Sequence, residues 1–273
     1  MSDPVYLGGM VIAGVAAGSL GALLGLGGGI ILVPLLNAGL GLPFGDAAGL
    51  SLVGVLATSS SVSVASASRK LLNPRLAIVL LVFSVGGATL GAIWLDALSD
   101  RTFELIFGST AAIVAGVMVA RLDRRNVLPD AVRPGVLGGA FLDDDTRFQV
   151  VYRVRRLPIA ATASVAAGVL ASFVGVGGGI LIVPALNTWC GVPIRVAAAT
   201  SAYMIGITAV PGVVGHGLEG HLGGVELAGA ICVGVLIGYR LGLGLSARVN
   251  VRSLKLLMAV LLAFVAGEYL FFR

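Results

Sequence analysis

Apolar residues dominate this chain in ten stretches, separated by short polar connections or by glycine and proline. A helix that spans a bilayer needs about 20 apolar residues, and most of the stretches approach or exceed that length. The pattern therefore predicts an all-α polytopic membrane protein. The stretches run over 5–25, 29–41, 46–67, 76–97 and 103–120 in the first half, and over 158–175, 179–190, 195–215, 223–245 and 253–271 in the second.

The second and seventh stretches, 29–41 and 179–190, are too short to cross a bilayer alone. They are half-helices, re-entrant pieces or short tilted spans, and the sequence leaves these alternatives open. Each half then holds five crossings, or three if each glycine-broken pair is re-entrant. Both numbers are odd, so two similar halves of this kind have inverted orientations in the membrane.

The two halves are copies of one unit. Residues 25–37 return as residues 175–187 with nine of thirteen positions identical, and the same offset of 150 pairs Pro43 with Pro193. We therefore expect an N-terminal transmembrane repeat at 1–120, a cytoplasmic linker at 121–157 and a C-terminal inverted repeat at 158–273. Each copy interrupts an apolar stretch with three glycines and a proline, which suggests half-helices that break near the midplane.

The positive charges support this topology. With the N-terminus outside, 15 of the 18 lysines and arginines fall on one side of the membrane, most of them in 121–157. Cytoplasmic loops carry such an excess, so both termini are expected to be extracytoplasmic. The linker, with its mixed acidic and basic runs, is expected to be a solvated loop.

Composition agrees, because 58% of the residues are hydrophobic and only 11% are charged, against about 25% charged in soluble domains. The net charge of +5 reflects the basic residues of the cytoplasmic loops, which set the topology. We therefore expect no nucleic-acid partner. The sequence contains no phosphate-binding loop motif, no catalytic triad pattern and no metal-binding motif. We therefore expect no enzymatic activity, no ATP-driven mechanism and no cofactor.

The glycine runs Gly27–Gly29 and Gly177–Gly179 are the strongest candidates for a binding site. Helix N-termini expose unpaired N–H groups, and glycine lets a ligand approach the backbone closely. Two inverted copies bring two such ends together near the midplane, which suits a small anion. The alternative is that the glycines only permit tight helix crossing. Asn37 and Asn187, just past the breaks, are expected to bond freed backbone groups.

Hydroxyl groups follow each glycine run. Ser51, Thr200 and Ser201 are candidates to bond a ligand's oxygens, although such groups also join helices or bond their own backbone. Arg240 lies within an apolar stretch, where a charge is costly and suggests a function. Its alternative role is to reach the cytoplasmic interface with its long side chain.

Three further polar residues, His216, Glu219 and His221, lie in or beside the predicted connection 216–222. We expect a solvated surface loop there, with proton coupling as the alternative because histidine titrates near neutral pH.

The repeated Gly-x-Gly-Gly-Gly-x-x-x-Val-Pro element, followed by Ala-Ala-x-x-Ser, resembles the TauE/SafE (TSUP) family of sulfite exporters over essentially the whole chain. The resemblance implies secondary transport of small sulfur-containing anions, such as sulfite or organosulfonates, in prokaryotic cytoplasmic membranes. It marks Gly27–Gly29, Gly177–Gly179, Ser51, Thr200 and Ser201 as site residues. The family's Gly-Thr-Ser is altered here, and only the second copy retains the threonine.

The expected function is a secondary transporter that exports a small sulfur oxyanion by alternating access between the inverted repeats. The alternatives are a passive anion channel and a transporter of a small carboxylate. The expected partners are the small anionic substrate and the lipid bilayer. The expected binding residues are Gly27, Gly28, Gly29, Ser51, Gly177, Gly178, Gly179, Thr200, Ser201 and Arg240.

Overall fold

The structure is a computed structural model that describes residues 4–24, 27–68, 71–94, 100–120, 135–142, 149–222, 224–246 and 251–271. Parts of the predicted linker, 121–134 and 143–148, lie outside the described residues, and so do several of the basic positions counted above. The description below concerns the remaining ranges.

Each predicted apolar stretch corresponds to a helical segment, and the helix ends lie within a few residues of the expected bounds. The helices are α1 (Pro4–Leu24), α2 (Gly29–Pro34), α3 (Phe44–Ser68), α4 (Pro74–Ile93), α5 (Asp100–Ala120), α6 (Leu157–Val174), α7 (Gly179–Pro184), α8 (Ile194–Leu218), α9 (Val225–Ser246) and α10 (Val251–Phe271). Two π-helical turns, η1 (Leu35–Gly39) and η3 (Ala185–Trp189), continue α2 and α7. Within the described ranges, five helices are long and apolar enough to cross a bilayer. The prediction of an all-α polytopic membrane protein is confirmed.

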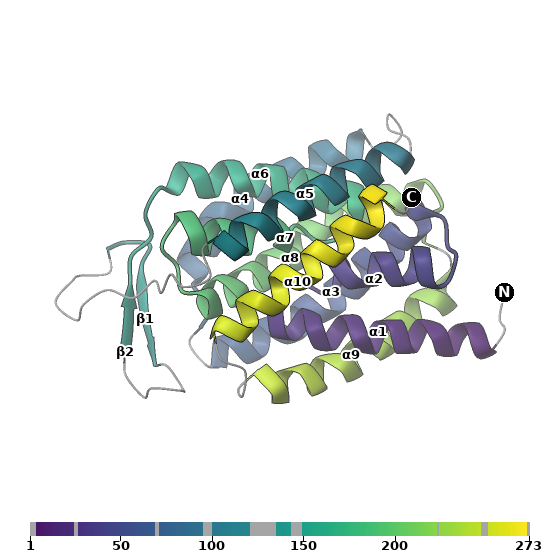
Figure 1. Ribbon diagram of the computed structural model, residues 1–273, viewed down its shortest axis with the longest axis horizontal. Helices are drawn as coiled ribbons and strands as arrows, with labels where there is room; N and C mark the ends of the chain where they lie inside the picture. Colours follow the sequence, from purple (N-terminus) through teal and green to yellow (C-terminus); the bar gives the residue numbers. More distant parts are fainter. Residues whose placement is uncertain are drawn as a thin grey trace.

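The long helices form one bundle with two distinct ends (Figure 1). Helix α1 begins and α10 ends at one end of the bundle, which we call the terminus end. The strands β1 (Gly139–Leu142) and β2 (Gln149–Tyr152) lie at the opposite end, which we call the hairpin end. Helices α1 and α6 therefore begin at opposite ends, as an inverted duplication requires.

In the second half of the chain, the short segment α7–η3 turns back to the end from which α6 started. A methyl group added at Gly178 would lie 2.7 Å from the carbonyl oxygen of Ala167, so α7 begins beside the middle of α6. The segment then returns to the beginning of α6, where the Arg155 N–H donates to the carbonyl of Cys190 over 2.9 Å. This segment is a re-entrant half-helix.

The first half repeats this path. A methyl group at Gly28 would lie 2.7 Å from the carbonyl oxygen of Ala17, in the middle of α1. One at Gly9, near the start of α1, would lie 3.1 Å from the Leu40 side chain, which follows η1. The two short segments therefore enter from opposite ends of the bundle and begin near its centre.

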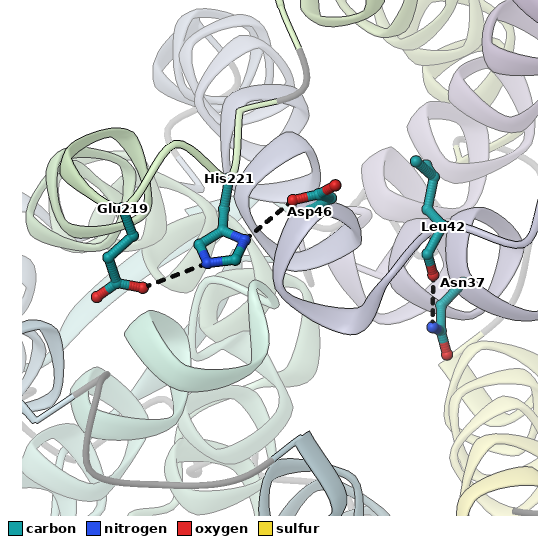
Figure 2. Close-up of polar contacts among 5 residues, drawn as sticks. All are labelled: Asn37, Leu42, Asp46, Glu219 and His221. Atoms are coloured by element: carbon teal, nitrogen blue, oxygen red, sulfur yellow. Dashed lines mark hydrogen bonds and ion pairs between the residues drawn. The ribbon is translucent and has the colours of Figure 1, made fainter.

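Each re-entrant segment ends in the same way. Its proline lacks an N–H group and is followed by a π-helical turn. The regular series of backbone hydrogen bonds of an α-helix is therefore incomplete there. The Asn37 side chain donates to the carbonyl of Leu42 over 2.8 Å (Figure 2). In the second half, the Asn187 side chain donates to the carbonyl of Val192 over 2.9 Å. The prediction that these asparagines bond the backbone is confirmed.

The two halves interlock through equivalent helix pairs. Helix α1 packs on α9, and α6 packs on α4. A methyl group at Gly238 of α9 would collide with the carbonyl of Val15, and one at Gly87 of α4 with the carbonyl of Val165. Val15 and Val165 are equivalent in the duplication. Each half therefore packs a glycine of one of its helices against the same backbone position of the other half. Glycine at these contacts permits the close approach of the paired helices.

The linker includes a packed element that the sequence analysis did not predict. Strands β1 and β2 pair antiparallel, with Phe141 opposite Val150. Both residues, and Tyr152, are buried against the bundle. The expectation of a solvated loop is wrong here, because these side chains pack in one buried cluster with residues of the helices.

Candidate functional site

The two glycine runs adopt left-handed backbone turns that begin the re-entrant helices. Gly27 and Gly28 have φ of 74° and 81°, and Gly177 and Gly178 have 75° and 77°. Residues with a Cβ atom avoid this conformation, which explains why glycine occupies all four positions. The helices that follow begin with N–H groups that have no partner within their own helix.

The two turns meet at the centre of the protein. Gly27 and Gly177 both pack against Val55 of α3 and Ile205 of α8: a methyl group at Gly27 would lie 3.2 Å from Val55 Cγ1 and 3.1 Å from Ile205 Cγ2. Val55 and Ile205 are equivalent in the duplication, and both are fully buried. The prediction that the glycine breaks come together therefore agrees with the structure, although a ligand at this point is a separate question.

Ser51 joins helix α3 to the second glycine turn. Its Oγ donates to the carbonyl of Gly175 over 2.8 Å. A methyl group at Gly29 would lie 2.7 Å from the same carbonyl, so the first helix start also touches this turn. Because its hydrogen is engaged in this bond, Ser51 Oγ has no hydrogen to donate to an anion's oxygen in this structure.

Ser201, the equivalent of Ser51, differs from it in hydrogen bonding. Its Oγ is fully buried and has no hydrogen-bond partner within the described residues. It lies one helical turn before Ile205 and therefore on the same face of α8 as the central contact. An unsatisfied buried hydroxyl costs about 1–3 kcal/mol, and such a group calls for an explanation.

Thr200 faces a different neighbour. Its Oγ1 accepts from the N–H of Asn73 over 3.2 Å. Asn73 also caps α4 by accepting from Leu76 N–H, and its side-chain amide donates to the hydroxyl of Tyr152 over 2.9 Å. Thr200 thus takes part in the contact between α8, α4 and the hairpin. The sequence analysis missed Asn73, for which the Asn-Pro pair at the start of α4 was the available signal.

Burial shapes the chemistry of this contact at the hairpin end. It raises the pKa of the Tyr152 phenol above its ordinary value, and the hydrogen bond with Asn73 opposes this only in part. The phenol therefore stays neutral at physiological pH. The groups that close the hairpin end, Asn73, Thr200 and Tyr152, are all uncharged.

Arg240 lies away from the other candidate binding residues. Its side chain is exposed on the outer surface of α9. Gly238 and Gly242, two residues to either side, face α1, and a helix turns by about 200° over two residues. The expectation that Arg240 binds substrate at the centre is therefore corrected: it points away from the bundle, where its long side chain can reach an interface.

The cluster of histidines and carboxylates at the terminus end also differs from expectation. His216 is buried within α8, and its Nε2 lies 3.0 Å from the carbonyl oxygen of Ser172. His221 contacts Asp46 of α3 at 2.9 Å and faces Glu219 at 3.7 Å (Figure 2). The expectation of a solvated loop is wrong for His216, whereas His221 and Glu219 lie in a partly exposed connection after α8 that contacts the first turn of α3.

Comparisons with known proteins show the family to which the chain belongs. The family described as "Sulfite exporter TauE/SafE" matches residues 10–269. A "Probable membrane transporter protein YunE" of Bacillus subtilis is 26% identical over 269 residues, which is 96% of each chain. A "Probable membrane transporter protein MJ0441" of Methanocaldococcus jannaschii is 26% identical over 271 residues, 93% of this chain and 91% of its own. No solved structure gives a significant match. The duplicated glycine turns, the helical bundle and these relatives together place the chain in the TauE/SafE sulfite exporter family of membrane transporters.

Proposed function

We propose that this transporter carries a small sulfur-containing oxyanion, sulfite or an organosulfonate, out of a prokaryotic cell across the cytoplasmic membrane. It does so by alternating access between its two halves, with both chain ends outside. The observation that carries the proposal is the meeting of two glycine turns beside Ser51 and the unpartnered hydroxyl of Ser201.

The chemistry of the centre suits an oxyanion. Helix starts offer N–H donors and a partial positive charge, and glycine allows a ligand to reach them. Ser201 Oγ is free to donate a hydrogen bond to a ligand oxygen without breaking a bond inside the protein. A bound oxyanion would thus satisfy a group that the folded protein leaves unsatisfied. The family description supports a sulfur oxyanion as the ligand.

The packing at the centre favours a moving carrier over an open channel. Val55 and Ile205 are fully buried between the two glycine turns. An anion passes this point only if the halves shift relative to each other, as alternating access requires. A passive channel needs a continuous polar path instead.

Binding is tested by the thermal stability of the purified protein with sulfite, sulfate, thiosulfate, sulfoacetate, taurine and acetate. A ligand that binds only the folded state stabilises it by about 2.7 kcal/mol at 100 times its Kd. We expect this stabilisation with sulfite or a sulfonate, and we expect Ser201→Ala to remove most of it. Ser164→Ala is the matched control, because its buried hydroxyl bonds its own helix at the carbonyl of Ala160.

Other outcomes would contradict the proposal in distinct ways. Stabilisation by acetate alone would indicate a carboxylate transporter. Equal loss of stabilisation in both serine variants would remove Ser201 from the site. Flux into liposomes that rises linearly with concentration, without saturation or counterflow, would indicate a passive channel.

A further inference from the structure

The two ends of the bundle are closed by equivalent connections that carry different chemistry. At the hairpin end, the connection between α3 and α4 contacts α8 through Asn73 and Thr200, which are neutral. At the terminus end, the connection between α8 and α9 contacts α3 through His221 and Asp46, which carry ionisable side chains. Among the described residues, the histidine–carboxylate contact therefore lies at the terminus end, and the Asn73–Thr200 contact of the equivalent connection is neutral.

The geometry at the terminus end joins the two halves of the chain. His221 Nδ1 lies 2.9 Å from Asp46 Oδ1, and its Nε2 lies 3.7 Å from Glu219 Oε2 (Figure 2). The side chain of His221 is 39% exposed and that of Asp46 is 28% exposed. Protons can thus reach the contact from the solvent without opening the bundle.

The protonation state of His221 decides how many of these contacts it can make. A neutral imidazole carries one N–H group, whereas an imidazolium donates from both nitrogens. With carboxylates on both sides, only the imidazolium attracts both, through the hydrogen bond to Asp46 and through its charge at 3.7 Å from Glu219. Loss of the proton leaves a nitrogen lone pair facing a carboxylate oxygen, which weakens the link between the halves.

The same contact covers the start of α3. A methyl group at Gly45 would lie 2.9 Å from His221 Nδ1, and one at Gly49 would lie 3.2 Å from His216 Cβ. His221 therefore sits directly on the helix that carries Ser51 toward the centre. A shift of His221 away from Asp46 uncovers this face of α3.

His216 lies beneath His221, with ring centroids 6.1 Å apart. Its Nε2 faces the carbonyl of Ser172, so this nitrogen carries the hydrogen, and its buried Nδ1 has no partner within the described residues. The titratable groups that face His221 are thus Asp46, Glu219 and His216. Across the described ranges, no group of three or more histidine, cysteine or acidic side chains could hold a metal ion.

We propose that Asp46, His221 and Glu219 form a proton-binding latch that holds the terminus end closed when His221 is protonated and releases it when the proton leaves. Its place in a transport cycle rests on the proposed function, but the latch itself acts without substrate. Because protonation stabilises the closed form, the closed form prevails at low pH and opening becomes more favourable as pH rises. For one linked proton, the ratio of open to closed protein changes by at most about tenfold per pH unit.

The test measures access to the buried position Leu52 of α3, which is fully covered in this structure. Leu52→Cys is made in a chain with Cys190→Ala and Cys232→Ala, and its labelling rate by a membrane-impermeant maleimide is measured without substrate from pH 5.5 to 8. Each rate is divided by that of Leu218→Cys, an 85% exposed position at the same end, which removes the reagent's own pH dependence. We expect the ratio to rise by about tenfold.

Two variants and a control make the result specific. His221→Gln and Asp46→Asn should each give a high ratio that no longer changes with pH. Thr200→Val, which alters the neutral contact at the hairpin end, should keep the rise. A flat ratio in the parent chain, or an unchanged rise in both latch variants, would overturn the proposal. Anion binding with a flat ratio would refute the latch alone, whereas a pH-dependent ratio without anion binding would refute the proposed substrate alone.

Discussion

Gly27 and Gly177 occupy equivalent places in the duplicated unit, yet alanine is expected to cost more stability at Gly177. Their φ angles are 74° and 75°, so alanine suffers the same backbone strain at both, about 1–2 kcal/mol. Their surroundings differ. A methyl group at Gly27 would lie 3.1 Å from Ile205 Cγ2 and 3.2 Å from Val55 Cγ1. At Gly177 it would lie 2.8 Å from Val55 Cγ1 and would overlap Ile205 Cγ2.

The difference in magnitude follows from this overlap. Overfilling a packed core typically costs about 1–3 kcal/mol, and the overlapped side chains are fully buried with little room to move. We therefore expect Gly27→Ala to lower the free energy of unfolding by about 1–2 kcal/mol. Gly177→Ala should lower it by about 2–5 kcal/mol, since strain and overlap add.

Titration of the purified protein with a denaturing detergent in mixed micelles measures these changes. Gly8→Ala is the control, because a methyl group there meets no atom within 4 Å and its backbone is helical, so stability should rise by about 0.5–1 kcal/mol. Equal losses at Gly27 and Gly177, or a larger loss at Gly27, would refute the reasoning from central packing.

Three further predictions concern other parts of the structure. Gly238→Leu should destabilise the protein by about 3 kcal/mol in the same titration, because its side chain would collide with the backbone of Val15, and an unchanged stability would contradict the described helix pair. Asn37→Leu and Asn187→Leu should each cost about 0.5–1.5 kcal/mol, since each removes a buried hydrogen bond from a side chain to the backbone; a large loss in only one variant would show that the two contacts are unequal. Cys190 is fully buried, so maleimide should label it only after unfolding, and rapid labelling of folded protein would show that it is exposed.

The helices were predictable from local signals. Apolar stretches long enough to cross a bilayer, and the glycines and prolines that interrupt them, act within a few residues of chain. The bonding of Asn37 and Asn187 was predictable for the same reason, because each asparagine reaches a carbonyl five residues ahead. The hairpin was not predictable, because its buried side chains gain their stability from distant helices.

The candidate site was only partly predictable. The duplication pointed to the glycine turns and to the serines, but it treated Ser51 and Ser201 as equals. The structure distinguishes them, since one bonds Gly175 and the other has no partner within the described residues. For Arg240, the sequence located a charge in an apolar stretch without showing which way it faced. That direction depends on which face of α9 packs against α1.

The sequence alone determined the all-α membrane class, the duplication and the positions where the helices break. Hydropathy, glycine and proline act on the backbone locally, and a duplication is recognised by comparing the two halves of the sequence. Only the tertiary structure decided that the short segments turn back, that the two turns meet at Val55 and Ile205, and that His221 joins α8 to α3. These are contacts between residues far apart in the chain. They depend on how whole helices pack, and no local pattern encodes which face of one helix meets which face of another.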